Sequence, residues 1–366
     1  MATDLETIIG YKNLCGVIQG VKGGTGMDFP PEFLRVTKQI SGKTGEYTRV
    51  DGDRKVARIV AYGSPSQRRN LTGISKVAVN LLHSFEHEII EGAILLALQD
   101  SNAQKQEMGA AEIARQTGDF ARRFDELRKA MVRSILATGQ IHFDEDGNLL
   151  ASSDGAAFSI DFGVPAGNKD QLDVFGDGDI IDVSWDNAAA KIAVHMRALQ
   201  EAAVRLTGYE LTHAFYGKNI VEYLLKNTSV GKLIQNNNAL NTSLQSGIIP
   251  DGFMGIQKWF KMNVSFFEDE DGEIVEIFGD NDITFTPTPS SDWWGFIEGS
   301  YPVPTNLGNV SGDASGAAGG LAEIFGRFSY AHIINDPTGI KQYAGDTMLP
   351  VLQVPKAIFI ATVDFE

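Results

Sequence analysis

The stretch RKAMVRSILATGQIHFDEDGNLL, residues 128–150, decides what kind of fold this sequence can form. Its first half continues a pattern of apolar residues at helical spacing that begins near residue 107. Gly139 is the expected end of that helix, because glycine accepts the left-handed conformation that closes many helices. The residues after Gly139 read as a strand and a turn at Asp146-Gly147, with a return strand at 158–163. Nothing in the stretch has the character of a reaction centre.

The helix predicted over 107–138 is amphipathic. Gly118 interrupts its first half and marks a candidate bend or break. Its apolar stripe comprises Ile113, Phe120, Phe124, Leu127, Met131 and Ile135. Its solvent-facing side is predicted to carry Arg122, Arg123, Asp125, Glu126 and Arg128. A helix of this length with one apolar face needs a broad surface to pack on, so it predicts a scaffold element.

The composition limits the class of protein. The chain has 366 residues, of which 43% are hydrophobic, so it can form one large domain or two linked ones. Its net charge of −16 argues against sequence-specific nucleic-acid binding, which needs clustered basic residues. Cys15 is the single cysteine, which excludes an internal disulfide and a cysteine-rich zinc site. No apolar run reaches the ~18 residues of a membrane span, and no signal peptide is evident, so we expect a cytosolic product without membrane contact.

The N-terminal region has two unusual parts. Residues 1–45 are rich in glycine and predict a mostly extended arm, whose apolar residues Phe29 and Phe33 need a surface to lie on. Residues 46–62 predict a β-hairpin turning at Asp51-Gly52. Both faces of this hairpin mix basic and apolar residues, as in a ribbon that lies across another surface. An ordinary edge hairpin explains the same pattern equally well.

Residues 74–100 place apolar side chains at helical spacing and predict a second helix. His83, Glu86 and His87 within it match H-x-x-E-H. On a helix the two histidines would lie one turn apart and could share a zinc ion, with Glu86 polarising a bound water. However, the motif overlaps the apolar stripe and lacks an evident third ligand, so chance placement is the favoured interpretation.

Other candidate sites are weaker. The acidic turns at 144–148 and 268–272 suggest calcium but fail the EF-hand pattern, and solvated hairpin tips explain them better. The glycine-rich segment 20–26 matches neither common phosphate-binding motif. Trp293 and Trp294 are interpreted as packing anchors. We therefore expect no catalytic residue, metal or cofactor.

The second half alternates helices and strands. A helix capped by Asp186 is predicted to end at Gly208, and a strand and a short helix should follow it. A hairpin is predicted over Asp271-Gly272, and the chain closes with a buried strand. The expected fold class is α+β.

Several blocks occur in a characteristic order between about residues 120 and 363. They are RRFDELRKAMVRSILATGQIHFDEDGNLL, FSIDFGVPAG, WDNAAAKIAVHMRALQEAAVRLTG, ELTHAFYGKNIVEYLLKN, IFGDNDITFTP, WWGFIEGSYPVP and MLPVLQVPKAIFIATV. This ordered set resembles the lambda-type phage major capsid protein family, capsid protein E. One departure is Asp346-Thr347-Met348, where that family often has Ser or Arg before its last Pro-Leu segment.

The resemblance implies the Hong Kong 97-like capsid fold. In that fold 1–45 would be the N-terminal arm, 46–72 the extended loop hairpin, and 73–184 the peripheral domain with its spine helix at about 107–138. Residues 185–345 would form the axial domain, and 346–366 would return as a strand to the peripheral domain. The residues expected to contact neighbouring subunits are Phe29, Phe33, Arg49, Asp51, Gly52, Arg54, Lys55 and Arg58.

The resemblance also implies a function. The chain would be the major capsid protein of a tailed bacteriophage, made in the host bacterial cytoplasm and assembled into an icosahedral shell around double-stranded DNA. Its partners would be copies of itself in hexamers and pentamers, a scaffolding protein, a portal and, in some phages, a decoration protein. Two alternatives stay open at this point: a zinc-dependent hydrolase using His83, Glu86 and His87, and another self-assembling phage protein such as a tail-tube subunit.

Overall fold

The computed structural model describes residues 11–20, 29–50, 74–99, 102–234, 237–262, 266–268, 274–304, 321–335 and 338–365. Its helices are α2 (Tyr11–Gly20), η1 (Pro31–Leu34), α3 (Gly92–Gln99), α4 (Ala103–Thr138), η2 (Ala166–Asn168), α5 (Ile192–Thr207), α6 (Ile220–Lys226), α7 (Thr228–Ile234), α8 (Asn238–Gln245), η3 (Phe253–Gly255) and η4 (Pro355–Ala357). None of the helices in these ranges is long and apolar enough to cross a membrane.

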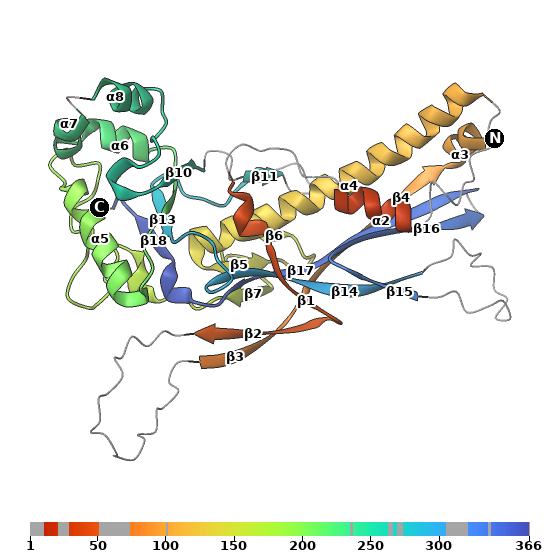
Figure 1. Cartoon of the computed structure of the whole chain (residues 1–366), viewed down its shortest axis with the longest axis horizontal. Helices are drawn as coiled ribbons and strands as arrows, with labels where there is room; N and C mark the ends of the chain where they lie inside the picture. The colour runs from red at the N-terminus through yellow and green to blue at the C-terminus, as the bar shows by residue number, and fades with distance from the viewer. Residues whose placement is uncertain are drawn as a thin grey trace, which may run out of the picture.

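The strands make up several separate sheets. They are β1 (Val36–Ile40), β2 (Thr44–Val50), β3 (Ile74–Asn80), β4 (Leu82–Glu91), β5 (Gln140–Phe143), β6 (Leu149–Leu150), β7 (Phe158–Asp161), β8 (Lys169–Asp170), β9 (His213–Tyr216), β10 (Lys258–Lys261), β11 (Phe266–Glu268), β12 (Ile274–Glu276), β13 (Asp282–Thr286), β14 (Trp294–Pro304), β15 (Leu321–Phe325), β16 (Arg327–Asn335), β17 (Thr338–Leu352) and β18 (Phe359–Thr362). Figure 1 shows an elongated molecule, with a long helix and sheet at one end and a cluster of short helices at the other.

Helix α4 is the predicted long helix. Asn102 caps its first turn, where the side-chain oxygen accepts a hydrogen bond from the Gln104 amide. Gly139 ends it in the left-handed conformation at φ 75°. A side chain at Gly139 would meet Val164 at 2.8 Å, so both the backbone and the packing favour glycine there. The helix runs without interruption through Gly118, so the predicted bend is wrong.

The long sheet is built around β17. It pairs antiparallel with β16, β4 and β14, and β1 joins β14 in parallel. Alternate residues of β17 are fully buried, because they face α4 and α2. Each meets a different turn of α4, and the pairs are Ile340 with Ile113, Gln342 with Thr117, Ala344 with Phe120 and Phe124, and Asp346 with Arg128. Every second residue of β17 therefore meets a successive turn of α4.

The helix predicted over 74–100 is wrong for most of its length. The structure has β3 and β4 there, and only α3, at 92–99, is helical. Ten successive residue pairs join β4 to β17, so sheet pairing overrides a helical apolar pattern. The arm predicted to be mostly extended also contains a helix, α2, which packs on β16 and α4.

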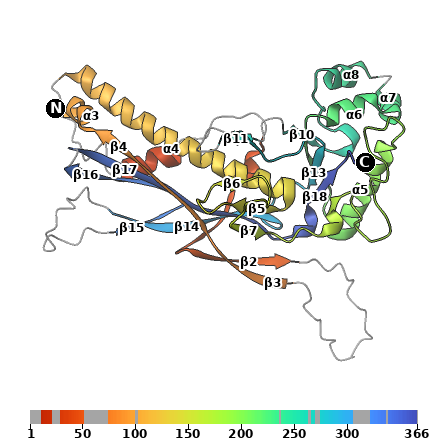
Figure 2. The same ribbon diagram turned by 180° about the vertical axis from the view of Figure 1, so that it is seen from behind.

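Strands β2 and β3 form a two-stranded ribbon that projects from the long sheet (Figures 1 and 2). The described partner of β2 is β3, with Val50 opposite Ile74, and not the segment directly after Asp51-Gly52. The hairpin is therefore longer than predicted. Its connecting residues, which include Asp51, Gly52, Arg54, Lys55 and Arg58, lie outside the described residues.

The other end of the molecule has its own core around the sheet β10-β9-β13-β18-β8. Helices α5 to α8 gather beside this sheet (Figure 1). Gly208 ends α5 as predicted, but the helix begins at Ile192 after Lys191, so Asp186 does not cap it. The predicted strand pairs β5–β7 and β11–β12 are present, while the turn of the latter pair lies outside the described residues.

The sheets cross the predicted domain boundaries in two places. Strand β17 crosses residue 345, where a boundary was placed, and β14 to β17 lie in the same long sheet as β4. The last strand, β18, pairs with β13 and β8 in the other sheet, and Phe359, Ala361 and Val363 belong to that sheet's core. Only residues 346–352 therefore return to the long sheet.

Candidate functional site

The H-x-x-E-H motif lies on a strand, which removes the geometry that zinc binding needs. Four residues along a strand span ~13 Å, so His83 and His87 cannot share one ion. Glu86 points to the opposite face, where it pairs with Arg123 at 2.9 Å. The Nδ1 atom of His83 lies 2.8 Å from the Thr347 hydroxyl. No group of three metal-ligating side chains occurs among the residues that the structure describes.

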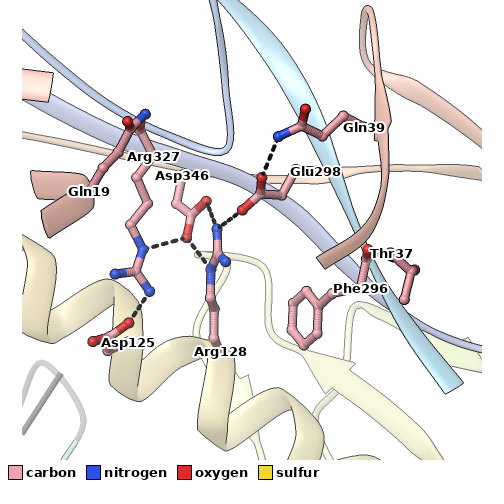
Figure 3. A network of polar contacts seen from close by, with 9 residues as sticks. All are labelled: Gln19, Thr37, Gln39, Asp125, Arg128, Phe296, Glu298, Arg327 and Asp346. Atoms are coloured by element: carbon pink, nitrogen blue, oxygen red, sulfur yellow. Dashed lines mark hydrogen bonds and ion pairs between the residues drawn. The ribbon is translucent and has the colours of Figure 1, made fainter. Parts of the chain in front are cut away.

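The most concentrated polar site is an ion cluster buried between α4 and the long sheet (Figure 3). Arg128 donates from Nε and Nη2 to the two carboxylate oxygens of Asp346, at 2.7 Å each. Its Nη2 also donates to Glu298 Oε1 at 3.0 Å. The side chain of Asp346 is 0% exposed and that of Arg128 is 7% exposed. The paired, two-pronged geometry gives this contact its strength and its direction.

Neighbouring elements extend the cluster. Arg327 on β16 contacts Asp125 of α4, and its Nε lies 3.5 Å from Asp346. Gln39 on β1 donates to Glu298 at 3.2 Å, and Gln19 on α2 donates to the Arg327 carbonyl at 2.8 Å. The cluster thus joins α4 to β14, β16 and β17, and it reaches the two N-terminal elements α2 and β1 (Figure 3).

The electrostatics of the cluster indicate a structural role and not a catalytic one. Burial alone lowers the pKa of Arg128, but Asp346 and then Glu298 outweigh it and raise the pKa above its ordinary value. Arg128 therefore stays charged at any pH at which the protein folds. Buried ion pairs cost desolvation, and their best-attested role is to specify one arrangement. We interpret the cluster as the device that holds α4 at one position on the sheet.

Sequence reasoning misplaced this site, because it assigned Asp125 and Arg128 to the wet side of the helix. Both are buried. A signal was present, since Arg128 follows Phe124 by four residues and precedes Met131 by three, which puts it within the apolar stripe. A charged residue in such a stripe requires a buried partner of opposite charge. The partner itself, 218 residues away, could not be found from spacing.

The predicted contact residues Phe29 and Phe33 turn inward. Phe33 is 0% exposed, and its ring lies 5.2 Å from that of Trp294, whose Nε1 donates to the Phe33 carbonyl at 2.8 Å. Phe33 is therefore buried within its own chain in this conformation. Phe29 is half-buried against Phe33. Trp293 packs on the same group, so the interpretation of Trp293 and Trp294 as packing anchors is confirmed.

A histidine lies beside this aromatic group. The His213 ring is 6.4 Å from that of Phe33, and its Nδ1 is 2.8 Å from the Thr212 hydroxyl. Burial, and then Lys258, lower the pKa of His213 to about 4, although Glu32 and Asp251 oppose the shift. His213 is therefore neutral at physiological pH and acts as a packing residue.

Arg49, also predicted to contact a neighbour, lies near the end of β2, opposite Ser75 of β3. Its Nη2 donates to the Gly163 carbonyl at 3.2 Å. The space beside Gly163 is filled by the Arg49 guanidinium, which a side chain at that position would meet at 2.2 Å. Arg49 thus ties the ribbon to the segment after β7 in its own chain.

Comparisons with known proteins find one matching family and several similar structures. A family model described as phage major capsid protein E matches residues 31–363. Curated protein sequences include no match. Among solved structures, a putative prophage capsid protein of E. coli CFT073 is similar at 12% identity and a TM-score of 0.56, over 97% of this chain and 99% of that one. A phage-related protein of Bordetella bronchiseptica RB50 is similar at 9% identity and a TM-score of 0.55, over 96% and 97%.

Proposed function

The chain belongs to the phage major capsid protein E family, and from this we propose how its parts serve assembly. As a family member it has the Hong Kong 97-like fold, is not an enzyme, and forms with its own copies the icosahedral shell of the virion. We propose that the copies associate as hexamers and pentamers. The match over 31–363 carries this proposal, because it spans both the long sheet and the helical end.

We propose that the chain has two portions with separate roles, each defined by the buried residues that share one hydrophobic core. The peripheral portion comprises α4 and the long sheet, including β14 to β17. The axial portion comprises the helical end from about residue 185 to 290, together with β18, because the buried residues of these segments share one core. Residues 1–45 serve as the arm and 46–72 as the extended loop at the tip of the β2–β3 ribbon. In this division the ion cluster stiffens the peripheral portion, because it holds α4 at one position on the long sheet.

We propose that the ribbon reaches a neighbouring subunit. Its supporting observation is that β2 and β3 form a separate two-stranded sheet among the described strands. One face of this ribbon packs on the long sheet of its own chain through Tyr47, which leaves the other face for a neighbour. The contact residues retained are Phe29, Arg49 and the loop residues, which are Asp51, Gly52, Arg54, Lys55 and Arg58. Arg49 would orient the ribbon through Gly163 while the loop residues make the contact.

Further partners are proposals by analogy with capsid assembly. A scaffolding protein would guide assembly, a portal would occupy one vertex, and a decoration protein would bind the finished shell. Synthesis would take place in the cytoplasm of the host bacterium, and the shell would enclose double-stranded DNA. The net charge of −16 supports a wall that does not bind this DNA tightly.

Electron microscopy of the purified chain, expressed alone and together with the candidate scaffolding gene, tests the proposal. We expect closed particles or rings of five and six subunits. Open tubes in both preparations would favour a tail-tube protein instead. A subunit that stays monomeric in both preparations would contradict assembly through the ribbon. The variant Asp51→Ala/Gly52→Ala is expected to reduce assembly while leaving the soluble subunit folded, as judged by circular dichroism.

A further inference from the structure

We propose that Trp185, His195 and Asp182 form a pH-sensitive switch, which holds the segment 181–190 against α5 while His195 is neutral and loosens it when His195 gains a proton. The inference concerns the folded subunit itself and goes beyond the proposed shell function. His195 lies on α5 and is 5% exposed, and Trp185 is 1% exposed. The Asp182 side chain, by contrast, is 70% exposed. A buried histidine therefore joins a buried tryptophan to a carboxylate in solvent.

The hydrogen bonds of His195 determine which of its ring nitrogens carries a proton. Nε1 of Trp185 donates to Nδ1 of His195 at 3.2 Å, and Nε2 of His195 lies 2.8 Å from Oδ1 of Asp182. An indole N–H can only donate, so Nδ1 of His195 accepts and has no proton. The proton is therefore on Nε2, which donates it to Asp182, and the ring is neutral.

A second proton on the ring would break one of these two hydrogen bonds. Both nitrogens of an imidazolium are donors, so Nδ1–H of His195 would face the N–H of Trp185. The Trp185 indole would lose this acceptor, and a buried donor without a partner is costly. The contact with Asp182 would become an ion pair and grow stronger. The two partners of His195 thus respond to the same proton in opposite ways.

The surroundings of His195 favour the neutral ring near pH 7. Burial lowers the pKa of His195 below its ordinary value of 6.5, Asp182 raises it, and Lys191 lowers it. Further charged residues on the elements that pack against α5, on α5 itself and on the segment are Lys232 of α7, Lys356 of η4, Arg197, and the exposed Asp179 and Asp186. Because folding lowers the pKa, the stability that the neutral ring contributes is complete above pH 6.5 and is lost as the pH falls toward the lowered pKa.

The segment 181–190 also binds two other parts of the helical end. The Trp185 amide donates to the Val363 carbonyl at 2.8 Å. The Asn227 side chain, between α6 and α7, donates to the Ala190 carbonyl at 2.8 Å. A change at His195 can therefore reach the residues after β18 and the junction of α6 and α7, which are both distant from α5 in sequence.

NMR of isotope-labelled histidine in the full-length, unassembled subunit tests the switch, because the two partners should shift the His195 titration in opposite directions. The ring signals are followed from pH 7.5 to 4.5 and assigned with His195→Asn. We expect Asp182→Asn to move the midpoint to lower pH by ~0.5 pH unit or more, because the charged ring loses its ion pair. Trp185→Phe should move it to higher pH, because protonation then breaks no hydrogen bond. Asp186→Asn, exposed on the same segment, is the matched control and should leave the midpoint unchanged.

The indole N–H signal of Trp185 gives a second readout. In the wild type we expect it to shift and to exchange faster with solvent over the pH range in which His195 titrates. In His195→Asn the side-chain oxygen can accept the indole bond without titrating, so we expect no such change. This signal and Asp182→Asn decide the question if Trp185→Phe does not fold.

Two results would overturn the switch. The first is a midpoint that Asp182→Asn leaves unmoved, or that Asp182→Asn and Trp185→Phe move in the same direction. The second is an indole signal that stays unchanged while His195 titrates. Neither result bears on shell assembly, which electron microscopy tests separately.

Discussion

Removing Arg128 should weaken the subunit more than any single exposed charge on the same helix. The variant Arg128→Met keeps much of the aliphatic volume but leaves Asp346, which is 0% exposed, without its two-pronged partner. Breaking a buried ion pair from one side costs about 3–5 kcal/mol. Arg327 still lies 3.5 Å from Asp346 and compensates in part. We therefore expect a loss of about 3 kcal/mol in the free energy of unfolding, at the lower end of that range.

The assay is urea unfolding of the unassembled subunit, followed by tryptophan fluorescence and circular dichroism. The matched control is Arg122→Met on the same helix, because that side chain is 62% exposed and pairs with Asp119 at the surface. The control should cost less than about 1 kcal/mol. The double variant Arg128→Met/Asp346→Leu should recover at least half of the loss, since neither charge is then left unpaired. Equal unfolding midpoints for Arg128→Met and Arg122→Met would refute the reasoning.

Two further predictions concern packing and pH. Gly345→Val should destabilise the long sheet by about 2 kcal/mol or more, because a side chain there would meet the Phe328 ring at 2.4 Å; an unchanged melting temperature would contradict this. The pKa of His213 is lowered from 6.5 to about 4, so the neutral form stabilises the fold. That stability is complete above pH 6.5 and is lost as the pH falls toward 4, a contribution of about 3 kcal/mol. Urea unfolding at pH 7 and pH 4 should therefore show a larger fall in stability for wild type than for His213→Gln, by about that amount; equal falls would contradict the reasoning.

Much of the local structure is determined by the sequence alone. The long helix and its end at Gly139 follow from apolar spacing and from the conformational freedom of glycine, and both depend on residues close together in the chain. The strand pairs β5–β7 and β11–β12 are predictable for the same reason. The order of the sequence motifs also predicts the family, because that order does not depend on the contacts between them.

Only the tertiary structure decided the rest. Residues 82–91 have an apolar spacing that a helix could use, and they become a strand because β17, about 250 residues later, pairs with every one of them. Arg128 lies in an apolar stripe because Asp346 neutralises it from across the sheet. Phe33 lies in the core of its own chain, because Trp294 and Phe215 pack around it. In each case the residue that determines the conformation or burial is distant in sequence. A local sequence pattern does not specify which distant residue will be in contact.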